Sequence, residues 1–477
     1  MVTEKIQSYS KFSDLQSALK TGQLKVADLI EYYCDRIEKY THLNAFLEVF
    51  KVEALLRAEE IQKKIDNGTA GKLAGMIIGL KDNISFKGHE MTASSKILKG
   101  YHAVYSATVT KRILAEDAII IGRLNCDEFA MGASNETSFF GPVKNFADET
   151  KVSGGSSGGS AVAVQANLCF ASLASDTGGS IRQPAAFCGV VGLKPTYSRV
   201  SRYGVVAYAS SFDQVGPITR SVDDAALILE VIAGNDVHDS TSSNLKVPEY
   251  SQLLNDKGKK KIAYIEETLH SDGLDQEIKD NILSQIQKLK DEGHTVEPVS
   301  FEFLDYVVAT YYILTTAEAS SNLARYDGVH YGYRSPDATD LMSTYKKSRS
   351  EGFGEEVKRR IMLGTFVLSA GYYNAYYSKA QKARRLIKEK MDHILEDYDF
   401  IITPTTPTHA FNIGEEITDP VVMYLADIFT VGASLAGLPA ISIPSGKNKA
   451  GLPIGMQIIG KRFKEENLLA FAKNLDH

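Results

Sequence analysis

Residues Lys151–Thr196 read KVSGGSSGGSAVAVQANLCFASLASDTGGSIRQPAAFCGVVGLKPT. Two glycine clusters in this stretch flank the hydroxyl side chains of Ser156, Ser157 and Ser180, and an apolar run separates them. Glycine is used where the backbone takes positive φ or where another group approaches closely, and it carries an entropic cost on folding. Two such clusters around serines therefore predict an active site.

Two other interpretations of the glycines are weaker. A flexible linker would be polar throughout, whereas residues 161–174 are mostly small and apolar. A phosphate-binding loop presents backbone NH groups to an anion, but its pattern requires a lysine directly after the last glycine. No such lysine follows either cluster.

The position of a preceding strand separates the candidate nucleophiles. Residues 154–158 satisfy the pattern G-x-S-x-G, but that nucleophile elbow must follow a buried strand, and the preceding NFADETK at 145–151 is polar and turn-like. By contrast, LCFASLA at 168–174 is typical of a buried strand and leads to Ser180. Ser180 is therefore the favoured nucleophile.

The backbone around Ser180 is suited to bind an oxyanion. Glycines at 178 and 179 allow the NH groups of Thr177, Gly178, Gly179 and Ser180 to converge, and fixed donors of this kind each contribute about 2.7 to 4 kcal/mol to catalysis. A serine nucleophile also needs a base. None of the ten histidines lies in a glycine-rich context, although a histidine distant in sequence remains an alternative.

Lys81 is the other candidate base. It follows the short apolar run MIIGL at 76–80, which is typical of a strand. A lysine at a strand end can extend its ammonium group to solvent, which is the ordinary structural interpretation. To act as a base, its pKa must fall from about 10.4 to about 7 or 8, and burial at a strand end can supply that shift.

Lys81, the cluster GGSSGG at 154–159 and the segment DTGGSIR at 176–182 together resemble the amidase signature family in order and separation. The resemblance implies a Ser-cisSer-Lys triad in which Ser180 is the nucleophile, Ser156 follows a cis peptide bond and Lys81 is the base. It also implies an α/β fold with a central mixed, mostly parallel β-sheet and helices on both faces.

Four further stretches resemble the branch of this family that works in tRNA-dependent amidotransferases: residues 125–132, 318–328, 348–365 and 371–377. In that branch the amidase component hydrolyses glutamine and passes ammonia to a B subunit. The B subunit uses ATP and magnesium to amidate Glu-tRNA(Gln) or Asp-tRNA(Asn), and a small C subunit completes a heterotrimer. The resemblance therefore implies no cofactor and no metal in this chain.

The same resemblance implies a glutamine pocket. Arg360 would bind the α-carboxylate, Asp427 the α-ammonium group, and Tyr311 would be a further contact. The neighbouring Arg359 and Tyr312 are alternatives one residue away. Two other functions remain open: a stand-alone amidase for another small amide, and a non-catalytic scaffold for the B subunit.

Composition limits the partners and the compartment. The chain has 477 residues, is 44% hydrophobic and 23% charged, and carries a formal net charge of -6. A protein that bound tRNA alone would need a clear basic field, so we expect tRNA to contact a partner subunit. The four cysteines lack metal-ligand spacing and no run is long enough to span a membrane, which favours a cytoplasmic protein with reduced thiols.

One amidase signature domain is expected over 1–477. It would comprise an N-terminal helical segment of about 1–70, a catalytic core of about 71–240, and a pocket and C-terminal part at 241–477. Apolar periodicity predicts helices within 12–64 and over 107–116 and 275–291. The predicted strands are 76–80, 118–121, 168–174, 261–265, 400–403, 440–444 and 454–459.

Overall fold

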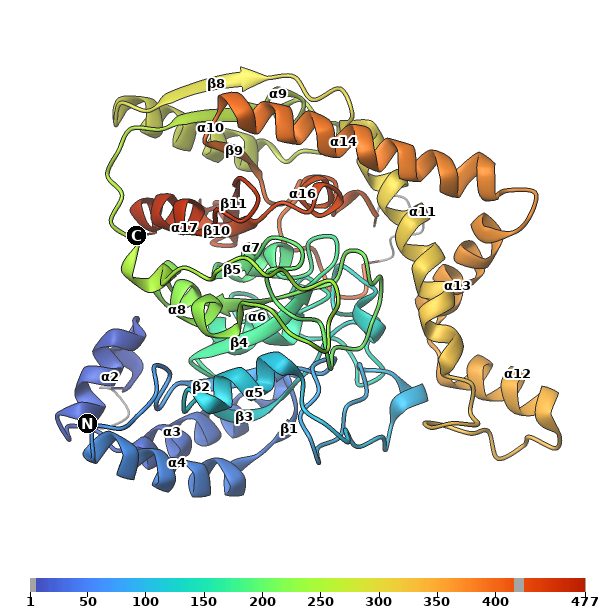
Figure 1. The fold of residues 1–477 in the computed structure, drawn as a ribbon, viewed down its shortest axis with the longest axis horizontal. Helices are drawn as coiled ribbons and strands as arrows, with labels where there is room; N and C mark the ends of the chain where they lie inside the picture. The colour runs from blue at the N-terminus through green and yellow to red at the C-terminus, as the bar shows by residue number, and fades with distance from the viewer. Residues whose placement is uncertain (1–5, 416–423, 477) are drawn as a thin grey trace.

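All named strands belong to one sheet. The computed structural model describes residues 6–415 and 424–476. Within these ranges the sheet has 11 strands in the order β1-β3-β2-β4-β6-β5-β10-β11-β9-β7-β8 (Figure 1). The three predicted segments of the chain all contribute strands to it, and the division of the chain into those segments stays a prediction.

The strands of the sheet are β1 Phe46–Val49, β2 Ile77–Lys81, β3 Ile119–Leu124, β4 Ala171–Asp176, β5 Val191–Lys194, β6 Gln214–Thr219, β7 Lys261–Ile265, β8 Thr295–Val299, β9 Phe400–Pro404, β10 Ala440–Lys447 and β11 Pro453–Ile459.

The α-helices are α2 Phe12–Lys20, α3 Val26–Lys39, α4 Lys51–Asp66, α5 Thr108–Ala115, α6 Gly158–Gln165, α7 Arg182–Cys188, α8 Val222–Ile232, α9 Glu266–Leu269, α10 Gln276–Asp291, α11 Leu304–Asn322, α12 Leu341–Gly352, α13 Glu355–Leu368, α14 Ser378–Asp397, α16 Val431–Ala436 and α17 Glu465–Leu475.

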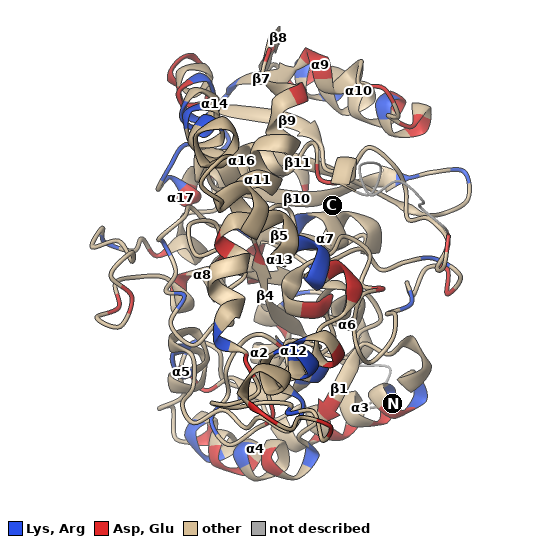
Figure 2. Cartoon of the chain, turned by 90° about the vertical axis from the view of Figure 1, so that its right-hand side faces the viewer, with Lys and Arg blue, Asp and Glu red and all other residues tan. Residues whose placement is uncertain are grey.

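Helices cover both faces of the sheet, as predicted. Figure 2 shows α5, α8, α14 and α17 on one side of the strands and α3, α6, α7 and α10 on the other. The central strands β2, β3, β4, β5 and β6 are buried along their whole length. A strand that is covered on both faces has near-continuous apolar sequence, which is why the short runs at or beside β2, β3 and β4 were recognisable.

The prediction that the sheet is mostly parallel is wrong, although the sheet is mixed. Parallel pairs join β2 to β3 and β4, and β7 to β8 and β9. The other pairs are antiparallel. The sequence pattern did not reveal β5 and β6, and these two strands together with the β10–β11 hairpin supply most of the antiparallel pairings.

Most of the predicted elements are present with shifted ends. β7 has the predicted bounds, and α10 begins one residue after its N-cap Asp275. β4 covers 171–176 instead of 168–174, so it carries Asp176 at its last position. The unpredicted strands have weak strand patterns: β6 and β8 contain proline, and β1 lies inside the helical pattern of 12–64.

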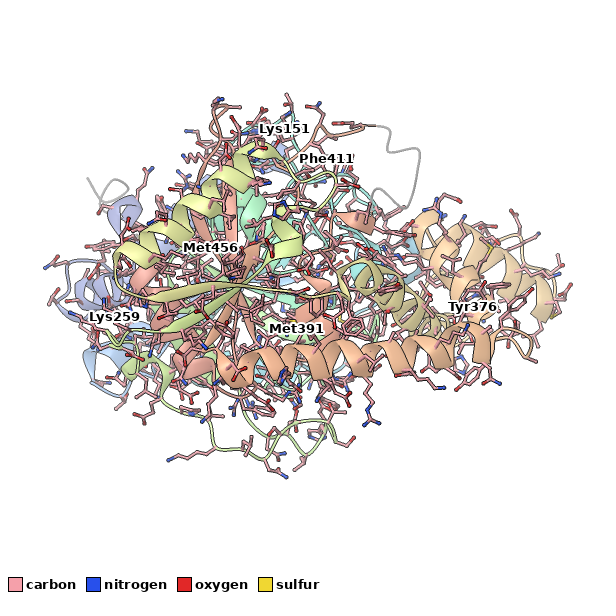
Figure 3. The ribbon with its side chains drawn as sticks, turned by 90° about the horizontal axis from the view of Figure 1, so that it is seen from above. Lys151, Lys259, Tyr376, Met391, Phe411 and Met456 are labelled. Atoms are coloured by element: carbon pink, nitrogen blue, oxygen red, sulfur yellow. The ribbon has the colours of Figure 1, made fainter. Side chains whose placement is uncertain are left out.

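An arm of helices projects beyond the sheet. Figure 1 shows α11, α12 and α13 at the right of the molecule, with the beginning of α14 beside them. Figure 3 shows α14 running from Tyr376, just before its first residue, to Met391, which lies over the body of the protein. Met391 is buried, whereas Tyr376 is 41% exposed.

No helix within residues 6–415 and 424–476 is long and apolar enough to cross a membrane. The four cysteines are buried and free of disulfide bonds. Burial raises the pKa of the Cys126 thiol to about 12, so it is a thiol and not a thiolate at neutral pH.

Candidate active site

Lys81 is fully buried at the last position of β2. Its Nζ donates to Ser156 Oγ at 2.7 Å, to Ser157 Oγ at 2.8 Å and to Ser175 Oγ at 3.1 Å. Burial lowers the pKa of the Lys81 ammonium group, against the opposing effect of Cys126 and the carboxylates of Asp127, Asp176 and Asp213. The lysine thus points into the protein and not to solvent, in an environment that favours its neutral form.

The serine cluster lies in a tightly packed segment. Residues 152–164 are buried, and the peptide bond between Gly155 and Ser156 is cis, as the resemblance implies. A side chain on Gly155 would collide with Asp127, and one on Gly159 would collide with the Asn125 carbonyl. The glycines therefore serve close packing, and the flexible-linker interpretation is wrong.

Ser156 and Ser157 differ in where their hydroxyl groups are bound. Ser157 Oγ donates to the Ser175 carbonyl at 3.1 Å, while Ser156 Oγ accepts from Lys81. The backbone of Ser157 also reaches the other glycine cluster, because its NH donates to the Ser180 carbonyl at 3.2 Å. This bond places the backbone of Ser180 beside the two adjacent serines that contact Lys81, and the catalytic roles of these residues stay a prediction.

The turn between β4 and α7 presents a row of backbone donors. In the part of the chain that the structure describes, the NH groups of Thr177, Gly178, Gly179 and Ser180 have no protein acceptor. Ser180 is 8% exposed, and it is the last of these four residues. Buried NH groups without acceptors are costly, so their presence here indicates a binding site for an oxyanion.

A buried ion pair holds this turn in place. The Arg182 guanidinium binds both carboxylate oxygens of Asp176, with Nε–Oδ2 of 3.0 Å and Nη2–Oδ1 of 2.9 Å. Burial alone would raise the pKa of Asp176, but the charge of Arg182 outweighs it and the pKa is lowered. Arg182 also donates to the Thr430 carbonyl at 2.9 Å, which ties the turn to the C-terminal part of the chain.

A second carboxylate supports the turn from the other side. Thr177 Oγ1 donates to Asp213 Oδ1 at 2.8 Å, and Asp213 Oδ2 accepts from the NH groups of Tyr208 and Ala209. Burial raises the pKa of Asp213 to about 6. These bonds fix the side chain of Thr177 and do not use its backbone NH group.

The predicted glutamine-binding residues gather beside this turn. Arg360 on α13 is 3% exposed, and its guanidinium lies 5.0 Å from the ring centre of Tyr312. Tyr312 donates its hydroxyl proton to Asp427 Oδ2 at 3.1 Å. Burial raises the pKa of Asp427 to about 7, while the positive charge of Arg360 opposes the shift.

Tyr311 and Tyr312 both belong to the site, but they face different parts of it. A Cβ added to Gly178 would lie 2.5 Å from the Tyr311 ring, so Tyr311 packs on the turn that precedes Ser180. Tyr312 links Arg360 to Asp427. Of the two arginines, Arg359 is 43% exposed and pairs with Glu356, whereas Arg360 is buried.

Sequence reasoning missed several residues of the pocket. Arg360 Nε donates to Glu356 at 2.7 Å and its Nη1 donates to the Tyr208 hydroxyl at 2.9 Å. No described residue accepts a hydrogen bond from its Nη2, which leaves the two N–H groups of that nitrogen for a carboxylate. The separation of Glu356 and Arg360 by four residues is a helical ion-pair spacing and could have indicated their contact. Nothing in the sequence pattern pointed to Tyr208.

A cavity of about 300 Å³ opens next to these groups. Ala133 and Ser134, which pack on Gly155, line one side, and Ile428, which follows Asp427, lines another. Phe411 and Leu425 make the remaining wall largely apolar. The cavity has the size and the mixed lining of a small-molecule site.

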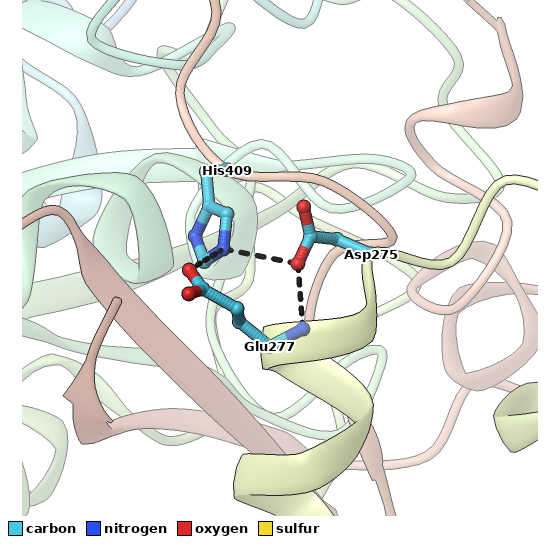
Figure 4. Close-up of side chains that lie close together, drawn as sticks. All are labelled: Asp275, Glu277 and His409. Carbon is cyan, nitrogen blue, oxygen red and sulfur yellow. Dashed lines mark hydrogen bonds and ion pairs between the residues drawn. The ribbon is translucent and has the colours of Figure 1, made fainter. Parts of the chain in front are cut away.

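A separate group of potential metal ligands lies between the loop after β9 and the start of α10. His409 Nε2 is 3.4 Å from Asp275 Oδ1 and 4.0 Å from Glu277 Oε2 (Figure 4). Both carboxylates already have partners, since Asp275 caps α10 by accepting from the Glu277 NH and Lys449 lies 3.5 Å from Glu277. These close approaches link the loop to the start of the helix.

Comparison with known proteins agrees with this geometry. The model of the amidase family matches residues 28–469. The A subunit of Glutamyl-tRNA(Gln) amidotransferase from Prosthecochloris aestuarii is 51% identical over 472 residues, which cover 98% of each chain.

Two solved structures share the fold. The crystal structure of the A subunit of Glutamyl-tRNA(Gln) amidotransferase from Thermotoga maritima has a TM-score of 0.77 and 42% identity, over 93% of this chain and 90% of that one. Peptide amidase from Stenotrophomonas maltophilia has a TM-score of 0.82 but only 28% identity, and the match covers 98% of this chain and 96% of that one.

Proposed function

This chain belongs to the amidase family, and we propose that it is the glutamine-hydrolysing subunit of a tRNA-dependent amidotransferase. The observation that carries the proposal is the buried Lys81 amine at 2.7 Å from Ser156 Oγ, beside the turn that bears Ser180. The identity of 51% to the A subunit of a Glutamyl-tRNA(Gln) amidotransferase over nearly the whole chain supports the choice of substrate.

The reaction begins with the removal of a proton from Ser180. Neutral Lys81 accepts a proton from Ser156 Oγ while Ser156 accepts the proton of Ser180 Oγ, and Ser180 Oγ bonds to the amide carbon of the glutamine side chain. The carbonyl oxygen becomes an oxyanion, which the NH groups of Thr177, Gly178 and Gly179 stabilise.

The proton held by Lys81 is then used to release ammonia. Lys81 returns it through Ser156 to the amide nitrogen, the carbon–nitrogen bond breaks and ammonia departs. The glutamyl ester on Ser180 is hydrolysed by water, which yields glutamate and restores the serine. No step requires a cofactor or a metal ion in this chain.

Glutamine binding rests on opposite charges in the pocket. Arg360 Nη2 would donate to the α-carboxylate, and ionised Asp427 would accept from the α-ammonium group. Tyr311 would contact the substrate next to the turn.

Ammonia is consumed in partner subunits. A B subunit would use ATP and magnesium to activate and amidate Glu-tRNA(Gln), or Asp-tRNA(Asn), and a small C subunit would complete the heterotrimer in the cytoplasm. The net charge of -6 supports this division, because a chain that lacks a basic field is poorly suited to bind tRNA itself.

Ammonia release tests the proposal. The chain is assayed with glutamine, alone and with its B and C partners, ATP and Glu-tRNA(Gln), and in parallel with asparagine, malonamide and a fatty amide. Release from glutamine that appears with the partners supports the amidotransferase role. Release from other amides without partners, and none from glutamine in any mixture, identifies a stand-alone amidase instead.

A further inference from the structure

An exposed aromatic cluster lies at the outer end of the helical arm. Six side chains from the end of α13 and the turn before α14 are each between 41% and 66% exposed: Met362, Leu363, Phe366, Tyr372, Tyr373 and Tyr376. We call these six residues the aromatic tip. Exposed apolar side chains are normal when they are scattered, but a contiguous group on a projecting element marks an interaction surface.

The sequence of this region has no charged residue from Ile361 to Ser378. Surface helices normally carry charges on their solvent face, and α14 does so as soon as it begins. Figure 3 shows Tyr376 at the end of α14 that extends away from the body of the protein. Neither folding of the sheet nor the active site accounts for apolar side chains at this place.

The rings of the tip are held by one another. The Phe366 and Tyr372 ring centres are 4.1 Å apart, and Tyr376 lies 5.9 Å from Phe366 and 6.0 Å from Tyr372. Contacts of this kind restrict the side chains before a partner binds, so little conformational entropy remains to be lost on binding. Tyrosine is also among the residues that contribute most to binding energy at protein interfaces.

The charges beside the tip define the partner. Lys379 and Lys382 lie one turn apart at the start of α14, both are exposed, and no described residue forms an ion pair with either. A second copy of the chain docked through the same surface would bring these lysines near their equivalents. RNA would need many more cations than these two. A protein segment with apolar side chains flanked by carboxylates would contact both the apolar side chains of the tip and the two lysines.

The tip also lies on the helix that carries Arg360. At 3.6 residues per turn, Met362 lies roughly 200° around α13 from Arg360. Arg360 therefore faces the pocket while Met362 faces solvent. A partner on the tip would contact the outer side of a helix whose inner side holds the substrate arginine.

We propose that the aromatic tip is the docking surface for another subunit of the amidotransferase, which contributes apolar side chains flanked by acidic ones. The proposal rests on the proposed function, because that function requires partner subunits.

The test uses the full chain and its co-expressed B and C subunits. Tyr372→Ser combined with Tyr376→Ser removes two rings, and Lys379→Glu combined with Lys382→Glu reverses the adjacent charges. Tyr306→Ser is the matched control, since Tyr306 is 63% exposed. Tyr306 is distant from the aromatic tip. Glu302, four residues before it, pairs with Lys390, which lies about 18 Å along α14 from Ser378 at the start of that helix.

We expect each double variant to lower the affinity for the partner subunits at least tenfold in sedimentation or biosensor titrations, with a thermal midpoint like that of the wild type. The charge reversal should lose less affinity at high salt than at low salt. Tyr306→Ser should bind like the wild type.

Three results would overturn the proposal: unchanged affinity in both double variants, a dimer of the chain alone that the variants abolish, or loss of RNA binding in place of subunit binding. Ammonia release is measured separately in the same preparations. A chain that assembles through the tip but never hydrolyses glutamine refutes the proposed function and leaves the docking surface intact.

Discussion

Two adjacent serine hydroxyls contact the Lys81 amine, and they differ in what else they bind. Ser157 Oγ donates its proton to the Ser175 carbonyl, so that proton is not available for transfer. Ser156 Oγ accepts from Lys81 and keeps its own proton free for a relay. At the scale of single residues, the structure therefore separates two side chains that the sequence GGSSGG does not distinguish.

Replacing these serines tests the distinction. We expect Ser156→Ala to lower kcat for glutamine hydrolysis by about 10²–10⁴, because it interrupts the proton path. Ser157→Ala should cost about tenfold or less, because it removes a support of Lys81 and not the path. Steady-state ammonia release by the assembled complex measures both. A larger loss of kcat in Ser157→Ala than in Ser156→Ala would show that the proton relay runs through Ser157 and would contradict the role proposed for Ser156.

The role proposed for Asp427 predicts that substrate binding depends on pH. Burial raises the pKa of Asp427 to about 7, so the carboxylate that would bind the ammonium group of glutamine is ionised above that pH and protonated below it. We expect kcat/KM for glutamine to fall about tenfold per pH unit as the pH drops below about 7. The Asp427→Asn variant should have a high KM and should lack this limb. If kcat/KM of Asp427→Asn fell below pH 7 as it does in the wild type, the pH dependence would belong to another group.

At the scale of elements, the turn between β4 and α7 depends on the ion pair of Asp176 and Arg182. Both side chains are fully buried, and the pair connects the turn to Thr430 near the glutamine pocket. A buried pair need not stabilise a protein relative to an apolar pair, but removal of one partner leaves a buried charge unpaired. Loss of Arg182 should therefore weaken both the fold and the turn that carries Ser180.

We expect Arg182→Met to lower the free energy of unfolding by about 3–5 kcal/mol. At an unfolding entropy of about 2.1 cal/mol/K per residue, this corresponds in a chain of 477 residues to a fall in the thermal midpoint of roughly 3–5 °C, measurable by circular dichroism. Arg385→Met is the control, since Arg385 is 79% exposed and pairs with Glu389 on the surface, where an ion pair contributes about 0–1 kcal/mol. Equal midpoints for the two variants would contradict the bracing role of Arg182.

The two strands that precede the candidate catalytic residues were recognisable from the sequence. The runs at 76–80 and 168–174 are short and mostly apolar, as expected of strands covered on both faces, so Lys81 could be placed at a strand end and Ser180 in the turn after a strand. β5 and β6 have no such signature, because glycine and proline interrupt them. Without them the sheet appeared mostly parallel, and its antiparallel centre, β4-β6-β5-β10-β11, emerged only from the structure.

At the scale of the whole molecule, the proposed glutamine pocket is assembled from residues that lie between 48 and 219 positions apart in the sequence. Tyr208, Tyr312, Arg360 and Asp427 meet because α11 and α13 pack beside the β4–α7 turn. No local pattern specifies such a meeting, which is why only the family resemblance pointed to Arg360 and Asp427. The contacts of Tyr312 with Asp427 and of Tyr208 with Arg360 required the three-dimensional structure.

Ser180 is the proposed nucleophile, and its ester with the glutamyl group is the intermediate that distinguishes it from Ser156 and Ser157. The decisive measurement follows radiolabelled glutamine through acid-quenched turnover by the assembled complex and locates the label by peptide mapping. We predict label as an ester on the peptide that carries Ser180, with both label and ammonia release lost in Ser180→Ala. Label on the peptide that carries Ser156 and Ser157, or ammonia release that persists in Ser180→Ala, would contradict it.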